Sequence, residues 1–202
     1  MITIGLTGGI ATGKSTVGSI LKELKVPLID SDELAHRAMD PGTSGYSEII
    51  GRFGAGIVGG DGRIDRKELG RIVFNDRGAR NDLEQIIHPR VIAAIERFLA
   101  EYRMAGQTLA VVEIPLLFEA GLTDLVDRIW VVSVSPEIQL QRLMERGGLS
   151  EAEARLRIGT QLPLELKEGN ADVVLYNNKG VSDLRSEVIK ILNLMGWGPV
   201  DG

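Results

Sequence analysis

Short apolar runs rich in β-branched residues occur five times along the chain, and segments with helical spacing separate them. The runs cover residues 2–6, 28–30, 108–114, 128–134 and 172–176. The last three are apolar almost throughout, which is typical of strands buried on both faces of a parallel sheet. After Lys14, apolar residues recur at helical spacing at Val17, Ile20, Leu21 and Leu24. Strands that alternate with helices predict a three-layer α/β core around a five-stranded parallel sheet.

Two intervals between strands are much longer than the dozen or so residues that a crossover needs. Residues 31–106 show no strong strand and predict a helical insertion, with one helix over 66–74 and another that begins at Pro89. Residues 136–169 predict a lid of two helices joined by Gly147-Gly148. The core would then comprise about 1–30, 107–135 and 170–202, all within one domain. The insertion leaves the core at the carboxyl end of a strand, where ligands bind in open α/β sheets.

Composition narrows the class of protein. The net charge is −5 and 44% of residues are hydrophobic, which argues against a general nucleic-acid or membrane-surface binder. The sequence contains no cysteine, which excludes disulfides, thiolate nucleophiles and cysteine-based zinc sites. No apolar run approaches the roughly 20 residues that span a bilayer. We therefore expect a soluble cytoplasmic protein with neither nucleic acid nor membrane as partner.

The most informative stretch is Gly8-Gly9-Ile10-Ala11-Thr12-Gly13-Lys14-Ser15, which follows the first strand and opens the first helix. This is the G-x-x-x-x-G-K-[ST] pattern in the structural context that it requires. Glycines let successive backbone N–H groups turn inward around an anion, and the helix N-terminus adds its dipole. Lys14 would reach the outer phosphates and the Ser15 hydroxyl would ligate Mg²⁺. The stretch predicts a nucleoside triphosphate site, with ATP and Mg²⁺ as ligands.

Carboxylates follow two of the expected strands. Asp30 and Asp32 end the second strand, and in an extended segment both would point the same way. Asp32 could accept a proton from an attacking hydroxyl, whereas the alternative is that these acids cap the next helix. Glu113 ends the third strand, where an acidic residue commonly assists the metal of such proteins.

Other polar residues leave two interpretations open. Arg142 and Arg146 share a helix face, with Arg155, Arg157 and Lys167 beyond. These cations could close over a phosphoryl-transfer site, or they could form a solvated face with the interleaved glutamates. Glu119 could be functional or simply solvated. His88 precedes Pro89, and by itself this pair indicates a helix start with His88 in a structural, capping role.

The motif pattern favours a small-molecule kinase over a GTPase. No Asp-x-x-Gly switch is present, and Asn178-Lys179 lacks the aspartate of a guanine reader. A kinase needs an acceptor pocket and a lid, and the two long intervals suit those roles. An alternative of another class is a regulatory ATP-binding module that performs no transfer.

Over nearly its whole length the chain resembles the dephospho-CoA kinase family. The shared motifs are the phosphate loop, Ile29-Asp30-Ser31-Asp32, Asp61-Gly62 with Arg66, His88-Pro89, Ile114 to Glu119, Gln141-Arg142 with Arg146 and Gln161, and Ala171-Asp172 with Asn177. The chain departs from the family pattern at three places. Ala11-Thr12 replaces the usual Gly-Ser, Glu113 replaces Asp, and Asn178-Lys179 stands where Ser is common.

This resemblance implies ATP-dependent phosphorylation of the 3′-hydroxyl of dephospho-CoA, the last step of coenzyme A synthesis. It implies a set of site residues: Asp32, Lys14 and Arg142 for catalysis; Ala11, Thr12, Gly13, Lys14, Ser15, Thr16, Arg142 and Asn177 for ATP; Asp32, Arg66, His88, Leu116 and Glu119 for the acceptor; and Ser15 and Glu113 for the metal. A nucleoside or nucleotide kinase of the same architecture is the alternative. We expect a monomer or a weak homo-oligomer whose partners are its small-molecule substrates.

Overall fold

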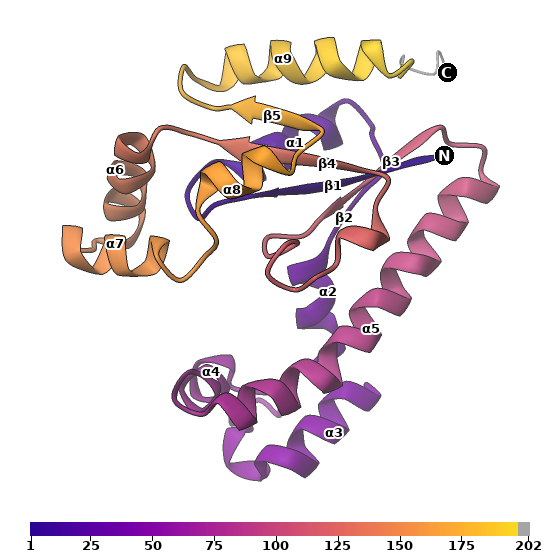
Figure 1. The fold of residues 1–202 in the computed structure, drawn as a ribbon. Helices are drawn as coiled ribbons and strands as arrows, with labels where there is room; N and C mark the ends of the chain where they lie inside the picture. The colour runs from indigo at the N-terminus through magenta and orange to yellow at the C-terminus, as the bar shows by residue number, and fades with distance from the viewer. Residues whose placement is uncertain (198–202) are drawn as a thin grey trace. The chain divides into compact units, whose positions relative to one another are not determined.

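The computed structural model describes residues 1–197, so residues 198–202 at the end of the expected core lie outside the described part. A five-stranded sheet has the strand order β2-β3-β1-β4-β5. Its strands are β1 (Ile2–Gly8), β2 (Leu28–Asp30), β3 (Leu109–Glu113), β4 (Arg128–Ser133) and β5 (Val173–Tyr176). The pairs β1–β3, β1–β4 and β4–β5 are all parallel. The predicted parallel α/β sheet is therefore confirmed (Figure 1).

Helices occupy the intervals between these strands. They are α1 (Lys14–Glu23), α2 (Ser31–Ala38), α3 (Ser44–Phe53), α4 (Arg66–Asn75), α5 (Arg77–Met104), α6 (Pro136–Gly147), α7 (Glu151–Ile158), α8 (Leu164–Gly169) and α9 (Val181–Leu194), with short 3-10 turns η1 (Ala55–Ile57) and η2 (Thr123–Leu125). No helix within residues 1–197 is long and apolar enough to cross a membrane.

The chain divides into two compact units, one formed by residues 1–29 with the chain from 99 onward and the other by residues 30–98. In the first unit, α1 and α9 contact each other and share one core with the central strands. That core includes Ile4, Leu6, Val17, Ile20, Leu21, Trp130, Val132, Leu184 and Val188. Because the central strands β1 and β4 are buried, they form a rigid base for the loops that follow them.

The second unit contains α2 to α4 and most of α5. Its buried apolar residues include Ile49, Ile57, Ile64, Leu69 and Ile87. One isolated antiparallel bridge joins Val58 to Ile64, and the described residues 31–106 contain no strand, as the sequence predicted.

The prediction that a helix begins at Pro89 is wrong. Pro89 lies inside α5, which runs unbroken from Arg77 to Met104. Proline removes one backbone donor from a helix interior, and the cost is smaller where solvent can reach the freed carbonyl. Pro89 is exposed, and the Arg90 guanidinium donates to the nearby Ile86 carbonyl. His88 is therefore an exposed mid-helix residue, so the helix-capping interpretation of His88 is also wrong.

The lid interval contains three helices, α6 to α8, where the sequence predicted two. The junction between α6 and α7 and its capping box at Ser150 and Glu153 are confirmed. α8 was missed because it spans only six residues, too few for a helical period to be recognised.

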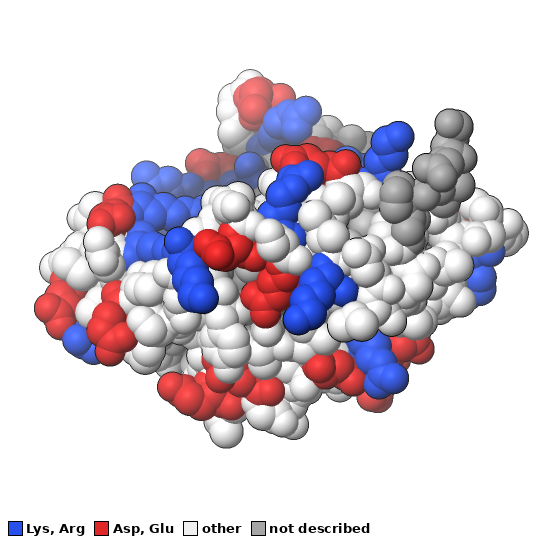
Figure 2. Space-filling model, turned by 90° about the horizontal axis from the view of Figure 1, so that it is seen from above, with Lys and Arg blue, Asp and Glu red and all other residues white. Residues whose placement is uncertain are grey.

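On the face that Figure 2 shows, basic and acidic side chains are interspersed.

Candidate phosphate-binding site

The glycine-rich loop lies between the end of β1 and the start of α1, as the motif requires. Two positions in this loop require glycine, because the backbone φ is positive there and because a Cβ would collide with a neighbouring atom. Gly8 has φ 153°, and a Cβ there would lie 2.4 Å from the carbonyl oxygen of Val132. Gly13 has φ 100°, and a Cβ there would lie 2.2 Å from Nδ2 of Asn177. Ala11 also has a positive φ of 61°, where the family pattern has Gly, but the loop keeps its turn.

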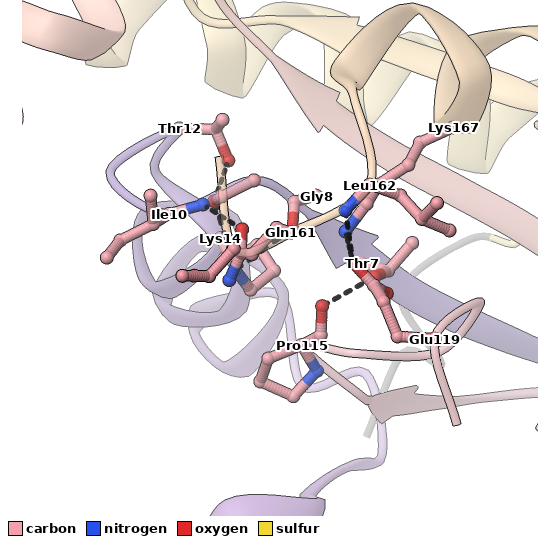
Figure 3. A network of polar contacts seen from close by, with 12 residues as sticks. Thr7, Gly8, Ile10, Thr12, Lys14, Pro115, Glu119, Gln161, Leu162 and Lys167 are labelled. Atoms are coloured by element: carbon pink, nitrogen blue, oxygen red, sulfur yellow. Dashed lines mark hydrogen bonds and ion pairs between the residues drawn. The ribbon is translucent and has the colours of Figure 1, made fainter. Parts of the chain in front are cut away.

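The polar groups of the loop are arranged around an anion site. The residue before α1, Gly13, has no side chain that could cap the helix, and the N–H groups of a first helical turn point out of its N-terminus. Nζ of Lys14 lies 3.3 Å from the carbonyl oxygen of Gly9 and 3.5 Å from that of Gly8. The buried Thr12 hydroxyl donates to Gly9 at 2.9 Å (Figure 3). Backbone donors, a helix dipole and a lysine together favour phosphate binding.

Asn177 and Arg142 connect this loop to β5 and α6. Nδ2 of the buried Asn177 donates to the Thr12 carbonyl at 3.0 Å. Arg142 in turn donates to the Asn177 carbonyl at 3.0 Å. The structure therefore brings two of the predicted ATP residues together and places Asn177 against the loop backbone.

Two glutamines from the segment 136–169 also contact the loop. Neither was among the predicted site residues, although Gln161 belongs to one of the shared motifs. Gln139 of α6 donates to the Ile10 carbonyl at 2.9 Å, and Gln161 accepts from the Ile10 N–H at 2.8 Å. A signal for Gln139 was present, because it lies four residues before the buried Leu143 and so shares its helix face. A polar residue on the buried face of an amphipathic helix indicates a specific partner.

Glu113 ends β3 and its side chain lies against α1. A Cβ on Gly18 would be 2.9 Å from Oε2 of Glu113, so the glycine makes room for the carboxylate. Gly18 is one helical turn from Ser15. Mg²⁺ in kinase sites keeps several waters and takes few protein ligands besides phosphate oxygens. A hydroxyl at the helix start with a carboxylate one turn away fits this ion, although the described residues include no cluster of three metal-ligating side chains.

Glu119 forms an ion pair with Lys167, so the interpretation of Glu119 as a solvated charge is wrong. Nζ of Lys167 lies 2.7 Å from Oε1 of Glu119, and the Lys167 side chain is 0% exposed and that of Glu119 20%. Glu119 also accepts from the Leu162 N–H at 3.0 Å. Burial would raise the pKa of Glu119, but the adjacent Lys167 charge and the N–H groups of Glu119 itself and Leu162 hold that pKa below its ordinary value.

This burial also corrects the expected role of Lys167 as a mobile lid cation. Its ammonium makes no well-aligned hydrogen bond within the described residues, so the close carboxylate compensates its charge. Arg155 pairs with Glu151 at 2.7 Å on an exposed surface, which fits the solvated-face alternative for that residue. Leu116, expected on the acceptor side, is exposed in the loop after β3.

The remaining predicted residues lie in the second unit. Asp30 ends β2 and caps α2 by accepting from the Asp32 N–H at 2.8 Å. Asp32 is thus in the first turn of a helix, and the expectation that both acids lie in an extended segment is wrong. The capping alternative holds for Asp30, because a carboxylate in the residue before a helix satisfies an otherwise free N–H.

A cavity of about 700 Å³ in the second unit contains many charged side chains. Its lining includes Glu33, His36, Arg37, Asp40, Asp61, Arg63, Arg66 and Lys67. Arg63 pairs with Asp40 at 3.0 Å. Arg66 is the first residue of α4 and is exposed beside this cavity, whereas His88 is not among its lining residues.

Comparison with known proteins shows which family shares this sequence and architecture. The family model described as dephospho-CoA kinase matches residues 2–183. A dephospho-CoA kinase from Geobacillus kaustophilus is 47% identical over 194 residues, which cover 95% of each chain. The solved dephospho-CoA kinase from Campylobacter jejuni is 32% identical with a TM-score of 0.72, over 95% of each chain. The structure TT1252 from Thermus thermophilus is 35% identical with a TM-score of 0.77, over 96% of this chain and 97% of that one. With its glycine-rich loop between β1 and α1 and this match along nearly its full length, the chain belongs to the dephospho-CoA kinase family.

Proposed function

We propose that this kinase transfers the γ-phosphoryl group of ATP to the 3′-hydroxyl of dephospho-CoA, which gives coenzyme A and ADP. The observation that carries this proposal is the phosphate loop, built at the end of β1 in a chain that matches the family from residue 2 to residue 183. The triphosphate would lie against the N–H groups of Ala11, Thr12, Gly13, Lys14, Ser15 and Thr16.

The transfer step is an in-line displacement at phosphorus. A bond forms between the acceptor oxygen and the γ-phosphorus while the bond to the β–γ bridging oxygen breaks, and the hydroxyl proton passes to Asp32. Lys14 would neutralise charge on the phosphates, and Arg142 would do so from the lid side. Asp32 is supported as the base by its exposed position directly after a strand of the core sheet.

Mg²⁺ is the expected metal, with Ser15 and Glu113 as the residues that would hold it or its water. When bound, the ion supplies positive charge that offsets the charge on the phosphate oxygens. The acceptor site is proposed in the charged cavity of the second unit. Arg66 and its neighbouring cations there would suit the diphosphate of dephospho-CoA, with His88, Leu116 and Glu119 as further expected acceptor-side residues.

An acceptor screen tests the proposal directly. With ATP and Mg²⁺, dephospho-CoA should yield ADP in step with coenzyme A, while nucleosides and nucleoside monophosphates should give none. Phosphorylation of a nucleoside instead would favour the nucleoside-kinase alternative. ADP release that does not depend on any acceptor, or no release at all, would favour a regulatory module. Oligomeric state and cytoplasmic location stay predictions, which light scattering and cell fractionation can test.

Substitution of Asp32 tests the base. Asp32→Asn should lower kcat by about 10²–10⁴-fold, because the hydroxyl then loses its proton acceptor. Affinity for ATP, measured by equilibrium binding, should stay unchanged because the phosphate loop is intact. Asp30→Asn is the neighbouring control, since its amide oxygen can still accept from the Asp32 N–H. Near-normal turnover in Asp32→Asn would assign the base elsewhere.

A further inference from the structure

The peptide of Ile10 is held by lid side chains at both of its polar atoms. Its N–H donates to Oε1 of Gln161 at 2.8 Å, and its carbonyl accepts from Nε2 of Gln139 at 2.9 Å. The backbone fixes the identity of the amide atoms, because an N–H needs an acceptor and a carbonyl needs a donor. Gln139 belongs to α6 and Gln161 to the segment between α7 and α8. Figure 3 shows the Gln161 side chain beside Ile10.

We infer that Gln139 and Gln161 are positioning residues that clamp the Ile10 peptide and thereby set the shape of the phosphate loop from the lid. The two bonds are complementary, since one glutamine acts as donor and the other as acceptor. Neither needs to touch the phosphates to act. They work by holding the residue that directly precedes the N–H groups available to the triphosphate.

Burial and space show that the clamp is built into the fold. Gln139 is only 5% exposed, so its amide has little access to water and depends on the protein for partners. A Cβ on Gly9 would lie 2.7 Å from Nε2 of Gln139. The second glycine of the loop therefore leaves the space through which Gln139 reaches Ile10.

The Gln161 end of the clamp is anchored by its neighbour. The N–H of Leu162 donates at 3.0 Å to Oε1 of Glu119, the same oxygen that pairs with the buried Lys167. Residues 161 and 162 are thus fixed between the phosphate loop and the loop after β3. A side chain whose backbone is held this way loses less entropy when it makes its bond.

The clamp has a consequence for nucleotide binding, which rests on the proposed function only in that ATP phosphates occupy this loop. The Ile10 N–H is already bonded to Gln161, so the phosphates would have to use N–H groups that follow it in the loop. Without the clamp, the loop would sample other shapes and the triphosphate would have to order it. We therefore expect weaker ATP binding and poorer alignment of the γ-phosphoryl group, with acceptor binding unchanged.

Amide hydrogen exchange of the nucleotide-free full chain tests the clamp without reference to activity. Gln161→Met should speed the exchange of the Ile10 N–H about tenfold, the effect of losing one hydrogen bond. Gln161→Glu should restore slow exchange, because a carboxylate oxygen also accepts. Gln139→Met should likewise speed exchange by loosening the loop, and Gln139→Glu should not rescue it, because a carboxylate cannot donate.

Steady-state kinetics test the functional consequence. Gln139→Met and Gln161→Met should each raise the KM for ATP about tenfold and leave the KM for dephospho-CoA within about twofold. Gln141→Met is the matched control on the same helix, since Gln141 is exposed and donates to Glu145 at 2.9 Å, away from the Ile10 peptide. Both KM values of Gln141→Met should equal those of the unmodified chain.

Unchanged Ile10 exchange in Gln161→Met would overturn the clamp, as would a KM for ATP no higher than that of Gln141→Met. If Gln139→Met does not fold, Gln161→Met decides alone, since that side chain is only half-buried. A chain that failed to phosphorylate dephospho-CoA would contradict the proposed function, but the exchange measurement would still decide the clamp.

Discussion

At the residue scale, the ion pair of Glu119 and Lys167 predicts that its two neutralising substitutions lower the free energy of unfolding by different amounts. The lysine side chain is 0% exposed and the glutamate 20%. Glu119→Gln leaves a fully buried ammonium without a counter-charge and should lower the free energy of unfolding by about 3–5 kcal/mol. Lys167→Met leaves a carboxylate that still accepts from Leu162 and can reach water, so the loss should be about 1–3 kcal/mol. Urea unfolding of each variant measures both values.

The double variant Glu119→Gln with Lys167→Met is the control for this asymmetry. It contains no unpaired buried charge, and apolar replacement of a buried pair is often nearly neutral. It should therefore be more stable than Glu119→Gln alone. Equal losses in the two single variants would mean that the Lys167 ammonium finds compensation other than Glu119.

At the element scale, α4 presents two arginines that differ in their surroundings. Arg66 begins the helix and lines the charged cavity, whereas Arg71 is held by Glu68 at 2.7 Å and is not among the lining residues. If the cavity takes the acceptor, Arg66→Met should raise the KM for dephospho-CoA about tenfold or more, because a charge-assisted bond to phosphate is lost. The KM for ATP should not change. Steady-state kinetics with each substrate varied in turn measure both constants.

Arg71→Met is the matched control, because it removes the same charge from the same helix. It should leave both KM values within about twofold, since an exposed ion pair contributes little. If both variants weaken acceptor binding equally, general electrostatic attraction and not a contact at Arg66 would be the cause.

The elements that could be predicted from the sequence are those with a strong local signal. All five strands were placed within two residues of their observed ends, because buried β-branched runs have few other interpretations. The phosphate loop was found because its glycines, lysine and serine form a local pattern at fixed spacing. The predicted helix start at Pro89 was wrong. Proline destabilises a helix locally, but the packing of a long helix can outweigh that loss of stability.

What the sequence could not supply were the contacts between distant segments. The bonds of Ile10 to Gln139 and Gln161 join residues more than a hundred positions apart, and no local pattern encodes them. The pairing of Glu119 with Lys167 was hidden for the same reason. A charge pattern cannot tell a buried ion pair from two solvated side chains.

At the scale of the whole molecule, the ionisation of several carboxyl groups determines how stability responds to acid. Among the described residues, the pKa is below its ordinary value for Glu68, Glu119, Glu137 and Glu153. Glu137 and Glu153 are exposed and Glu68 is half-exposed, and each is stabilised by a local donor, such as the Ser150 hydroxyl at Glu153. Only Glu119 combines a lowered pKa with a largely buried side chain and a buried partner. We therefore expect Glu119 to dominate the response.

A carboxyl group with a lowered pKa in the folded state stabilises the protein fully above its unfolded pKa. That stabilisation is lost as the pH falls through the folded value, because the unfolded chain then binds more protons. The free energy of unfolding should thus fall as the pH drops below about 4.5, the ordinary value for Glu119. Protonated Glu119 leaves Lys167 unpaired, as Glu119→Gln does at any pH. The two proteins should therefore differ at pH 7 and converge once the pH has fallen below the lowered pKa of Glu119, as urea titrations would show. Glu153→Gln, which alters an exposed cap, should track the unmodified chain closely. A difference that stayed constant as the pH was lowered from 7 would mean that Glu119 stabilises the fold through something other than its charge.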